Sequence, residues 1–194
     1  MAAQADGQKT DLYFAQQLLA GARGTSPLIC EMALRTMDSR FGSWNGYNHT
    51  PDAGAEQRDI VDWTSNAIAS ADAVPILSVA LSDGDRCVRR FAARLLARVR
   101  HSEALAALLD RLGNGDDRTQ EMAAMALGFS EDRDAVEGLI RSLTDDAATV
   151  RAAAAWALGQ IEDERALDAL SLVLEQDPDA SVRAQAARAL GEIG

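Results

Sequence analysis

Few residues of this 194-residue chain have the types and spacing that enzyme chemistry requires. The two histidines, His49 and His101, lie far apart, and the spacing of the chain suggests no nucleophile or base as a partner for His101. The motifs Cys-x-x-Cys and Gly-x-Ser-x-Gly and a glycine-rich phosphate loop do not occur. Acidic runs at 145–146 and 162–164 fall in turns, where carboxylates usually act as solvated helix caps. We therefore expect no catalytic, cofactor or metal site and predict that the chain is not an enzyme.

The chain has two cysteines, Cys30 and Cys87, which are too few for a disulfide framework or a metal cluster. Cys30 stands in an apolar run, which indicates a core position, and Cys87 precedes a predicted helix. A bridge between the two is an open alternative, but two free thiols are the favoured interpretation.

The chain is acidic, with a formal net charge of -11, and 18 of its 19 basic residues are arginine. Residues 57–194 alone contain 15 arginines and 24 acidic residues. Because nucleic acid and anionic lipid attract a net positive surface, this balance argues against both as partners. No apolar run approaches the length of a membrane span, so we expect no membrane insertion.

The first residues bear on the compartment. Ala3-Gln4-Ala5 has the form of a signal-peptidase site, but no apolar segment precedes it. We expect a cytoplasmic protein, and a trimmed export signal before Asp6 is the alternative.

The elements that hold these side chains come from a segment that repeats every 31 residues. Copies of its first part begin at Ala73, Ala104, Ala135 and Ala166. Copies of its second part begin at Val88, Thr119 and Val150, and, one residue late, at Val182. Within the second part apolar residues recur at steps 0, 4, 7, 8 and 11, which is one face of an α-helix. Polar turns at 82–85 and 144–147 offer aspartates as N-caps, so each repeat is predicted to be a helix hairpin.

The combination of an Ala-x-x-x-Leu helix, an aspartate-rich turn and Val-Arg-x-x-Ala-Ala-x-Ala-Leu-Gly resembles HEAT-like repeats, of the type also found in bilin-lyase subunits. The resemblance covers residues 57–194 and implies an all-α fold, a right-handed α-solenoid of stacked hairpins. It implies that the second helices line the concave face and that the arginine at step 1 binds the aspartate turns. That arginine is present as Arg89, Arg151 and Arg183.

The resemblance implies no particular reaction, because such repeats serve many unrelated proteins. HEAT-like di-iron hydroxylases carry repeated His-Glu pairs, whereas this chain has no His-Glu dipeptide. The iron ligands of those enzymes are therefore absent.

The N-terminal part departs from the period. We predict a flexible N-terminus at 1–10, a capping part at 11–56, and the repeats at 57–194, with the last two forming one continuous solenoid. In the capping part, one helix is expected to begin at Asp11 and another to follow Ser26-Pro27.

A turn-rich segment at 42–56 is too long for an ordinary connection between helices and is interpreted as an inserted loop. It contains Trp44, Tyr47 and His49. These side chains are interpreted as a cover for the end of the stack, and the second hypothesis is that they form a binding site.

Steps 3, 6 and 10 of the second helices should form a stripe that borders the concave surface. A solvated stripe should be mainly charged, yet this one contains tryptophan, methionine and phenylalanine, which are common in protein interfaces with arginine. Phe91 and Met122, at step 3, are interpreted as half-buried core. Arg90, Arg94 and Arg98 are four residues apart, which predicts one helix face. The candidate partner-binding residues are Trp63, Arg94, Arg98, Met125, Phe129, Trp156 and Arg188.

These observations predict a non-catalytic scaffold that binds a partner peptide or helix along the concave groove, with an acidic group of the partner near Arg94. No polar helix follows the last hairpin. We therefore also expect either a recognition or regulatory domain of a larger enzyme or sensor, or self-association through the open C-terminal edge. A bilin-lyase-like subunit with a tetrapyrrole in the groove ranks lower, because no residue signature is particular to chromophore handling.

Overall fold

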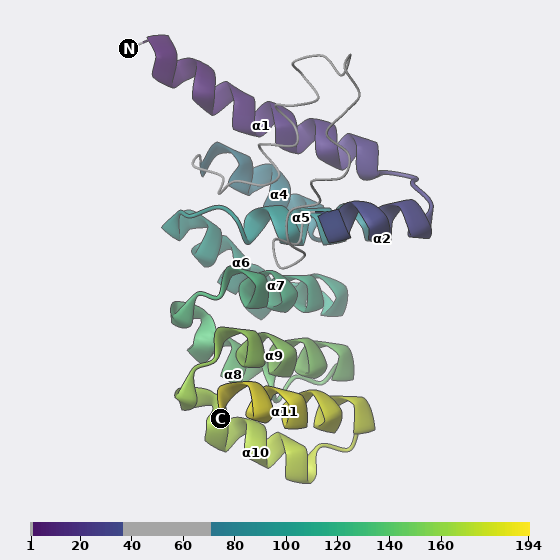
Figure 1. The fold of residues 1–194 in the computed structure, drawn as a ribbon, viewed down its shortest axis with the longest axis vertical. Helices are drawn as coiled ribbons and strands as arrows, with labels where there is room; N and C mark the ends of the chain where they lie inside the picture. Colours follow the sequence, from purple (N-terminus) through teal and green to yellow (C-terminus); the bar gives the residue numbers. More distant parts are fainter. Residues whose placement is uncertain (1, 37–70) are drawn as a thin grey trace. The chain divides into compact units, whose positions relative to one another are not determined.

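The computed structural model describes residues 2–36 and 71–194, and the side chains of residues 11–34 and 71–194. In these ranges the regular structure is helical and contains no β-strand. The residues group into two compact units, Met1–His101 and Ser102–Gly194, which are described separately. The predicted all-α solenoid of stacked hairpins is confirmed (Figure 1). The predicted boundary between residues 56 and 57 lies outside the described residues.

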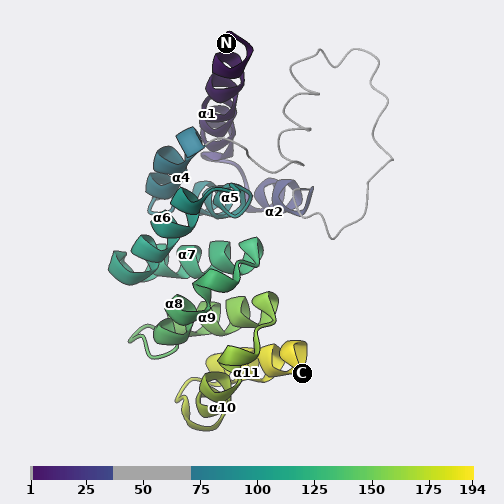
Figure 2. The same ribbon diagram turned by 90° about the vertical axis from the view of Figure 1, so that its left-hand side faces the viewer.

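The second unit consists of helix hairpins arranged in two layers. One layer holds α6 (Ser102–Asn114), α8 (Val136–Ser142) and α10 (Leu167–Gln176). The other layer holds α7 (Asp117–Ser130), α9 (Ala148–Ile161) and α11 (Ala180–Ile193). Each layer is a stack in Figures 1 and 2, and α9 contacts both α7 and α11. The helices thus follow the predicted period.

Small residues let the second helices approach one another closely. Ala154, Ala157 and Leu158, at steps 4, 7 and 8 of α9, are completely buried. A Cβ atom added to Gly128 on α7 would lie 2.8 Å from the Cα atom of Ala157 on α9. The backbones of the two helices are therefore close enough to exclude even a methyl group at this position.

Of the two turns predicted to supply caps, 82–85 does so, because Asp85 caps α5 (Arg86–Leu96) by accepting a hydrogen bond from the backbone N–H of Cys87. Asp116 caps α7 by accepting a hydrogen bond from the backbone N–H of Thr119, and Asp179 caps α11 through Ser181 and Val182. The prediction of an aspartate cap from the turn 144–147 is wrong, because the N-cap of α9 is Ala147, which has no side-chain oxygen.

The hairpins of the second unit are joined through residues in the left-handed conformation. Glu131 and Glu162 follow α7 and α9, and each has a φ of 54°. Short 3-10 helices follow them, η2 (Arg133–Ala135) and η3 (Glu164–Ala166). A left-handed residue satisfies the last carbonyls of a helix and turns the chain into the next hairpin.

The described part of the first unit contains α1 (Ala2–Ala22), α2 (Pro27–Thr36), η1 (Ala71–Ala73), α4 (Val74–Ala80) and α5 (Arg86–Leu96). The α1 helix contacts α4 and α5, and α2 contacts α5. The predicted helix after Ser26-Pro27 is confirmed. The predicted helix start at Asp11 is wrong, because α1 begins at Ala2. The flexibility predicted for residues 1–10 stays a prediction. Alanine and glutamine favour helix, and an aspartate inside a helical stretch does not end it.

A disulfide joins α2 to α5 in the first unit. Cys30 and Cys87 are bonded, with their Cα atoms 5.8 Å apart, and both side chains are buried. The core position of Cys30 is confirmed, but the prediction of two free thiols is wrong. The pairing depends on the packing of α2 against α5, and residue spacing in the sequence carries no information about that contact.

Candidate functional site

The structure describes six of the seven predicted groove residues. Arg94 and Arg98 belong to the first unit, and Met125, Phe129, Trp156 and Arg188 belong to the second. Trp63 and the loop residues Trp44, Tyr47 and His49 lie outside the described residues.

An aromatic pair connects two successive hairpins of the second unit. The rings of Phe129 on α7 and Trp156 on α9 meet edge to face, with centroids 4.9 Å apart and an interplanar angle of 68°. Both side chains are half-buried. A Cβ atom on Gly128 would lie 2.7 Å from the Trp156 ring, so the indole covers this glycine. Edge-to-face pairs stabilise contacts by about 0.5–1.5 kcal/mol beyond area burial.

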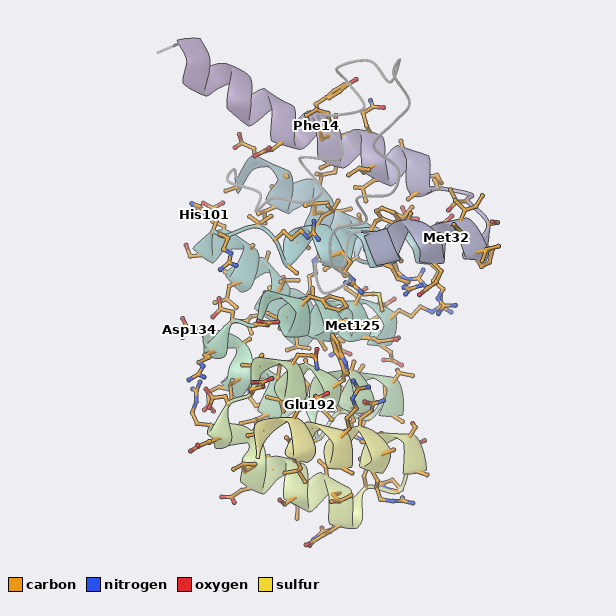
Figure 3. The ribbon with its side chains drawn as sticks, in the orientation of Figure 1. Phe14, Met32, His101, Met125, Asp134 and Glu192 are labelled. Atoms are coloured by element: carbon orange, nitrogen blue, oxygen red, sulfur yellow. A yellow bond between two sulfur atoms is a disulfide. The ribbon has the colours of Figure 1, made fainter. Side chains whose placement is uncertain are left out.

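Met125 extends this apolar surface along α7. It precedes Phe129 by one helical turn and is also half-buried. Figure 3 shows Met125 in the layer of second helices, which also carries the aromatic pair. We call Met125, Phe129 and Trp156 the aromatic face.

Three polar side chains of α9 and α11, in the same unit, form a hydrogen-bonded cluster. Glu192 accepts hydrogen bonds from Arg188 at 3.0 Å and from the amide of Gln160 at 3.1 Å. The Glu192 carboxylate also covers Gly159, where an added Cβ atom would overlap it. Arg188 is therefore part of an intramolecular ion pair, although its side chain is 62% exposed.

The step 3 side chains belong mainly to the core. Phe91, Met122 and Ala153 are all buried, and in Phe91 and Met122 the burial is deeper than the half-buried state predicted. The stripe therefore separates into a buried row at step 3 and a half-exposed row at steps 6 and 10.

The predicted arginine row on α5 is incomplete. Arg90 pairs with Glu31 on α2 at 2.7 Å, and Arg94 is half-buried in the last turn of α5. Arg98 lies beyond the end of α5 at Leu96, so the predicted row does not continue to it as one α-helix. The backbone N–H of Arg98 bonds to the carbonyl of Leu95, three residues earlier, so the chain winds more tightly here than in an α-helix.

The arginines at step 1 bind the turns, as the family resemblance implies. Each Nη1 atom donates to two carbonyls of the preceding turn, at distances of 2.7–3.1 Å, and these arginines are Arg89, Arg151 and Arg183. Arg151 also donates to both carboxylate oxygens of Asp177 in the next turn, at 2.7 and 3.0 Å. The hydrogen bonds from Arg151 lower the pKa of Asp177.

Sequence reasoning missed a second network, at the connections between hairpins. Asp163 is buried, whereas a solvated cap was predicted. Its carboxylate accepts hydrogen bonds from the guanidinium and backbone N–H of Arg165, and these lower its pKa to about 2. Arg165 also donates to the carbonyl of Arg133 at 2.8 Å, which links η3 to η2. The recurring Glu-Asp run at 131–132 and 162–163 was the available signal.

Two further findings bear on the chemistry of the described residues. They contain no group of three or more histidine, cysteine, aspartate or glutamate side chains that could hold a metal ion. None of their helices is long and apolar enough to cross a membrane.

Of three comparisons with known proteins, the match to a family model is the clearest. The family model of HEAT repeats matches residues 60–127 and 114–191. The comparison with curated proteins gives no match. A solved engineered protein is 27% identical to this chain, with a TM-score of 0.46. The match covers 70% of this chain and 65% of that protein, so this chain spans slightly less than two thirds of that protein's length.

Two natural proteins share the fold at lower identity. The complex of CpcE and CpcF of phycocyanin lyase from Nostoc sp. PCC7120 is 24% identical with a TM-score of 0.50, over 89% of this chain and 67% of that chain. Human deoxyhypusine hydroxylase, solved with glycerol, is 21% identical with a TM-score of 0.53, over 96% of this chain and 76% of that chain. With the match to the family model over most of its length, the chain belongs to the HEAT-repeat family.

Proposed function

We propose that this protein is a non-catalytic scaffold that binds a partner peptide or helix through the aromatic face. The observation that carries the proposal is the half-exposed pair of Phe129 and Trp156. Tryptophan and other aromatic side chains give rigid, large contact areas and dominate many protein interfaces. An apolar helix of a partner would cover the exposed parts of both rings and of Met125.

The charged residues add specificity to this proposal. Arg94 and Arg98, half-buried in the first unit, are proposed as a separate site for an acidic group. Arg188 can exchange its exposed pairing with Glu192 for a carboxylate of the partner at small cost, because exposed ion pairs contribute little.

The test is an affinity capture from the lysate of the native host, with matched variants of the purified chain. Trp156→Ala removes the indole, and Met125→Glu places a charge on the aromatic face. Leu172→Ala is the control, because this α10 side chain is also apolar and is 54% exposed in the same unit. A partner recovered with wild type and Leu172→Ala should be lost with both other variants.

The captured partner is then purified and titrated against the same variants. We expect Trp156→Ala to weaken binding at least tenfold, the range of an interface hot spot. Equal affinity for wild type, Trp156→Ala and Met125→Glu would refute the aromatic face as the binding site. Arg94→Glu tests the acidic group separately.

The fold likeness to phycocyanin lyase does not raise the rank of a tetrapyrrole-binding function, because at 24% identity it concerns the fold alone. Addition of a bilin, followed by absorbance, separates that function from peptide binding.

We also propose that the protein is exported from the cytoplasm, because it contains a disulfide. Disulfides persist in oxidising compartments, so the Cys30–Cys87 bond supports an exported protein over the cytoplasmic expectation. Alkylation of the protein from its native source should leave both cysteines unmodified until a reductant is added. Alkylation without reductant would support the cytoplasm.

A further inference from the structure

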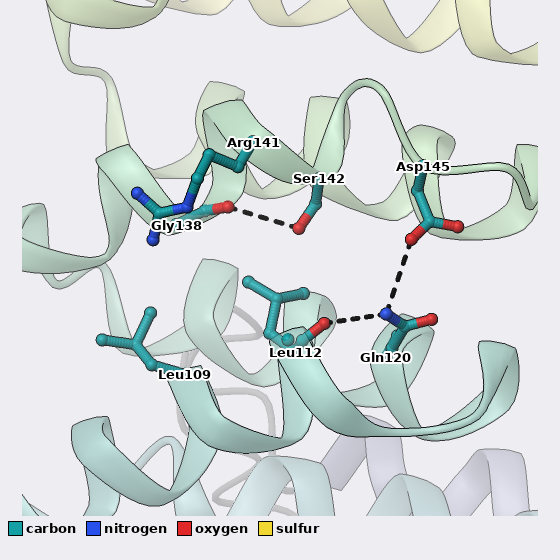
Figure 4. Close-up of a pocket in the computed structure, with 8 residues that line it drawn as sticks. Leu109, Leu112, Gln120, Gly138, Arg141, Ser142 and Asp145 are labelled. Carbon is teal, nitrogen blue, oxygen red and sulfur yellow. Dashed lines mark hydrogen bonds between the residues drawn. The ribbon is translucent and has the colours of Figure 1, made fainter.

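A pocket of about 190 Å³ opens in the second unit beside the turn that precedes α9. Its apolar side is formed by Leu109 and Leu112 of α6, and its polar side by Gln120 of α7 and Asp145 of the turn. Arg141 on α8 lies toward the opposite end from Asp145 (Figure 4). The pocket is thus open and largely polar, with two leucine side chains along one side and a carboxylate at one end.

Asp145 is one of three aspartates that hold equivalent positions in the turns. In each, one carboxylate oxygen accepts a hydrogen bond from the backbone N–H two residues later, at 2.8–2.9 Å, and the aspartates are Asp83, Asp145 and Asp177. The other oxygen of Asp83, in the first unit, accepts a hydrogen bond from Arg23 at 2.6 Å. Asp177, in the second unit, is bound by both Nε and Nη2 of Arg151.

Asp145 differs from these two because a glutamine takes the place of the arginine. Gln120 stands at step 1 of α7, the position that Arg151 holds in α9. Its amide donates to the carbonyl of Leu112 at 3.0 Å and reaches the Asp145 carboxylate only at 3.4 Å, beyond the usual range for an N–H···O bond. In the part of the chain that the structure describes, no ion pair involves Asp145.

We propose that this pocket binds a guanidinium group supplied from outside the chain, in the place that an arginine of the protein holds in the neighbouring turn. A guanidinium presents a planar fork of donors that matches a carboxylate, as Arg151 shows at Asp177. The methylene stem of an arginine would lie along Leu109 and Leu112, while its charged end reaches Asp145.

Arg141 is the charge that opposes this ligand. Its side chain is exposed and lines the same pocket, and it could also turn toward Asp145. Removal of Arg141 should therefore tighten guanidinium binding, because both the repulsion and the competing side chain disappear. This site is independent of the proposed partner-binding function, since none of Met125, Phe129 and Trp156 lines the pocket.

The test is a titration of the full 194-residue chain with N-acetyl-L-arginine amide, followed by NMR at the backbone amides of Gly138, Ser142 and Ala147. N-acetyl-L-citrulline amide is the matched probe, because it has nearly the same shape without the positive charge. We expect saturable shifts with the arginine probe and at least tenfold weaker binding of the citrulline probe.

Three variants locate the site. Gln120→Arg should fill the pocket with the chain's own guanidinium and weaken binding at least tenfold, and Asp145→Asn should do the same by removing the charge. Arg141→Ala should tighten binding several-fold. Gln120→Arg leaves the turn aspartate intact, so it decides the question if Asp145→Asn does not fold.

The proposal is overturned if wild type shows no saturable shifts, if the two probes bind equally, or if Gln120→Arg binds as wild type does. Free L-arginine distinguishes the source of the group. Tighter binding of L-arginine than of the amide identifies a free small molecule, and binding of the amide that is equal or tighter identifies a side chain of a partner protein.

Discussion

Arg151 on α9 holds the carboxylate of Asp177 with two hydrogen bonds, at 2.7 and 3.0 Å, and so ties two successive hairpins together. The side chains are only 11% and 5% exposed. Arg151 also binds the carbonyls of Asp145 and Asp146, so one guanidinium joins the turn of its own hairpin to the turn of the next. This contact fixes the register between these two hairpins, which local helix propensity does not determine.

Replacement of Arg151 tests how much its contact with Asp177 contributes to the free energy of unfolding. Arg151→Gln should lower the free energy of unfolding by about 2–4 kcal/mol, because it leaves Asp177 buried without its cation. Arg188→Gln, in the exposed pair with Glu192, should change it by less than about 0.5 kcal/mol. Urea unfolding of both variants measures the difference, and similar values for the two would contradict a structural role for Arg151.

The buried carboxylate of Asp163 should make stability depend on acid. Its pKa in the folded protein is about 2, below the ordinary 3.8, chiefly because the Arg165 guanidinium donates to it. A lowered folded pKa means that the contribution is complete above about pH 4 and is lost as the pH falls toward about 2.

Asp163→Asn should therefore flatten the curve of unfolding free energy against pH in that window. Asp168→Asn, which changes an exposed carboxylate on α10, is the control and should leave the slope as in wild type. Denaturant unfolding at a series of pH values gives the slopes. The assignment fails if Asp163→Asn and wild type have the same slope.

Two glycines at step 9 of the second helices give a matched test of close packing. Gly128 is covered by the Trp156 ring and by Ala157, whereas Gly191 has open space where a Cβ atom would lie. Gly128→Ala should lower the free energy of unfolding by about 1–3 kcal/mol through overpacking. Gly191→Ala should leave it unchanged or raise it by up to about 1 kcal/mol, since alanine favours helix.

Thermal unfolding of the two glycine variants decides this prediction. If Gly128→Ala is as stable as wild type, α7 and α9 can move apart to admit a methyl group without a loss of unfolding free energy. The packing under the aromatic face would then not be tight. Trp156 fluorescence is not a unique reporter because the chain has three tryptophans, so circular dichroism is the better signal.

The disulfide should contribute measurably to the first unit. The bond closes a loop with a sequence separation of 57 residues, and loss of a native disulfide typically costs about 2–5 kcal/mol. Reduction of wild type should lower its stability to that of Cys30→Ala/Cys87→Ala, and the reductant should not affect the double variant. An effect of equal size on both proteins, or on neither, would show that the bond is not formed in solution.

The sequence alone was sufficient for the repeat, the helix hairpins and most of the core. Val150, Ala154 and Leu158 recur at a helical spacing, and this spacing predicts that they form the buried face of a helix. Caps by turn aspartates were predictable because a cap involves residues within one hairpin. The turn contacts of the step 1 arginines were implied by the family resemblance.

Contacts between elements could not be predicted in this way, because they depend on how closely separate helices approach. Three features arise where segments distant in sequence meet: the Cys30–Cys87 bond, the burial of Asp163 and the pocket beside Gln120. In the candidate site, too, sequence predicted the positions of the residues, and helix packing determined their contacts. Sequence periodicity placed Phe129 and Trp156 on exposed steps, and only the close packing of α7 against α9 brought their rings to 4.9 Å.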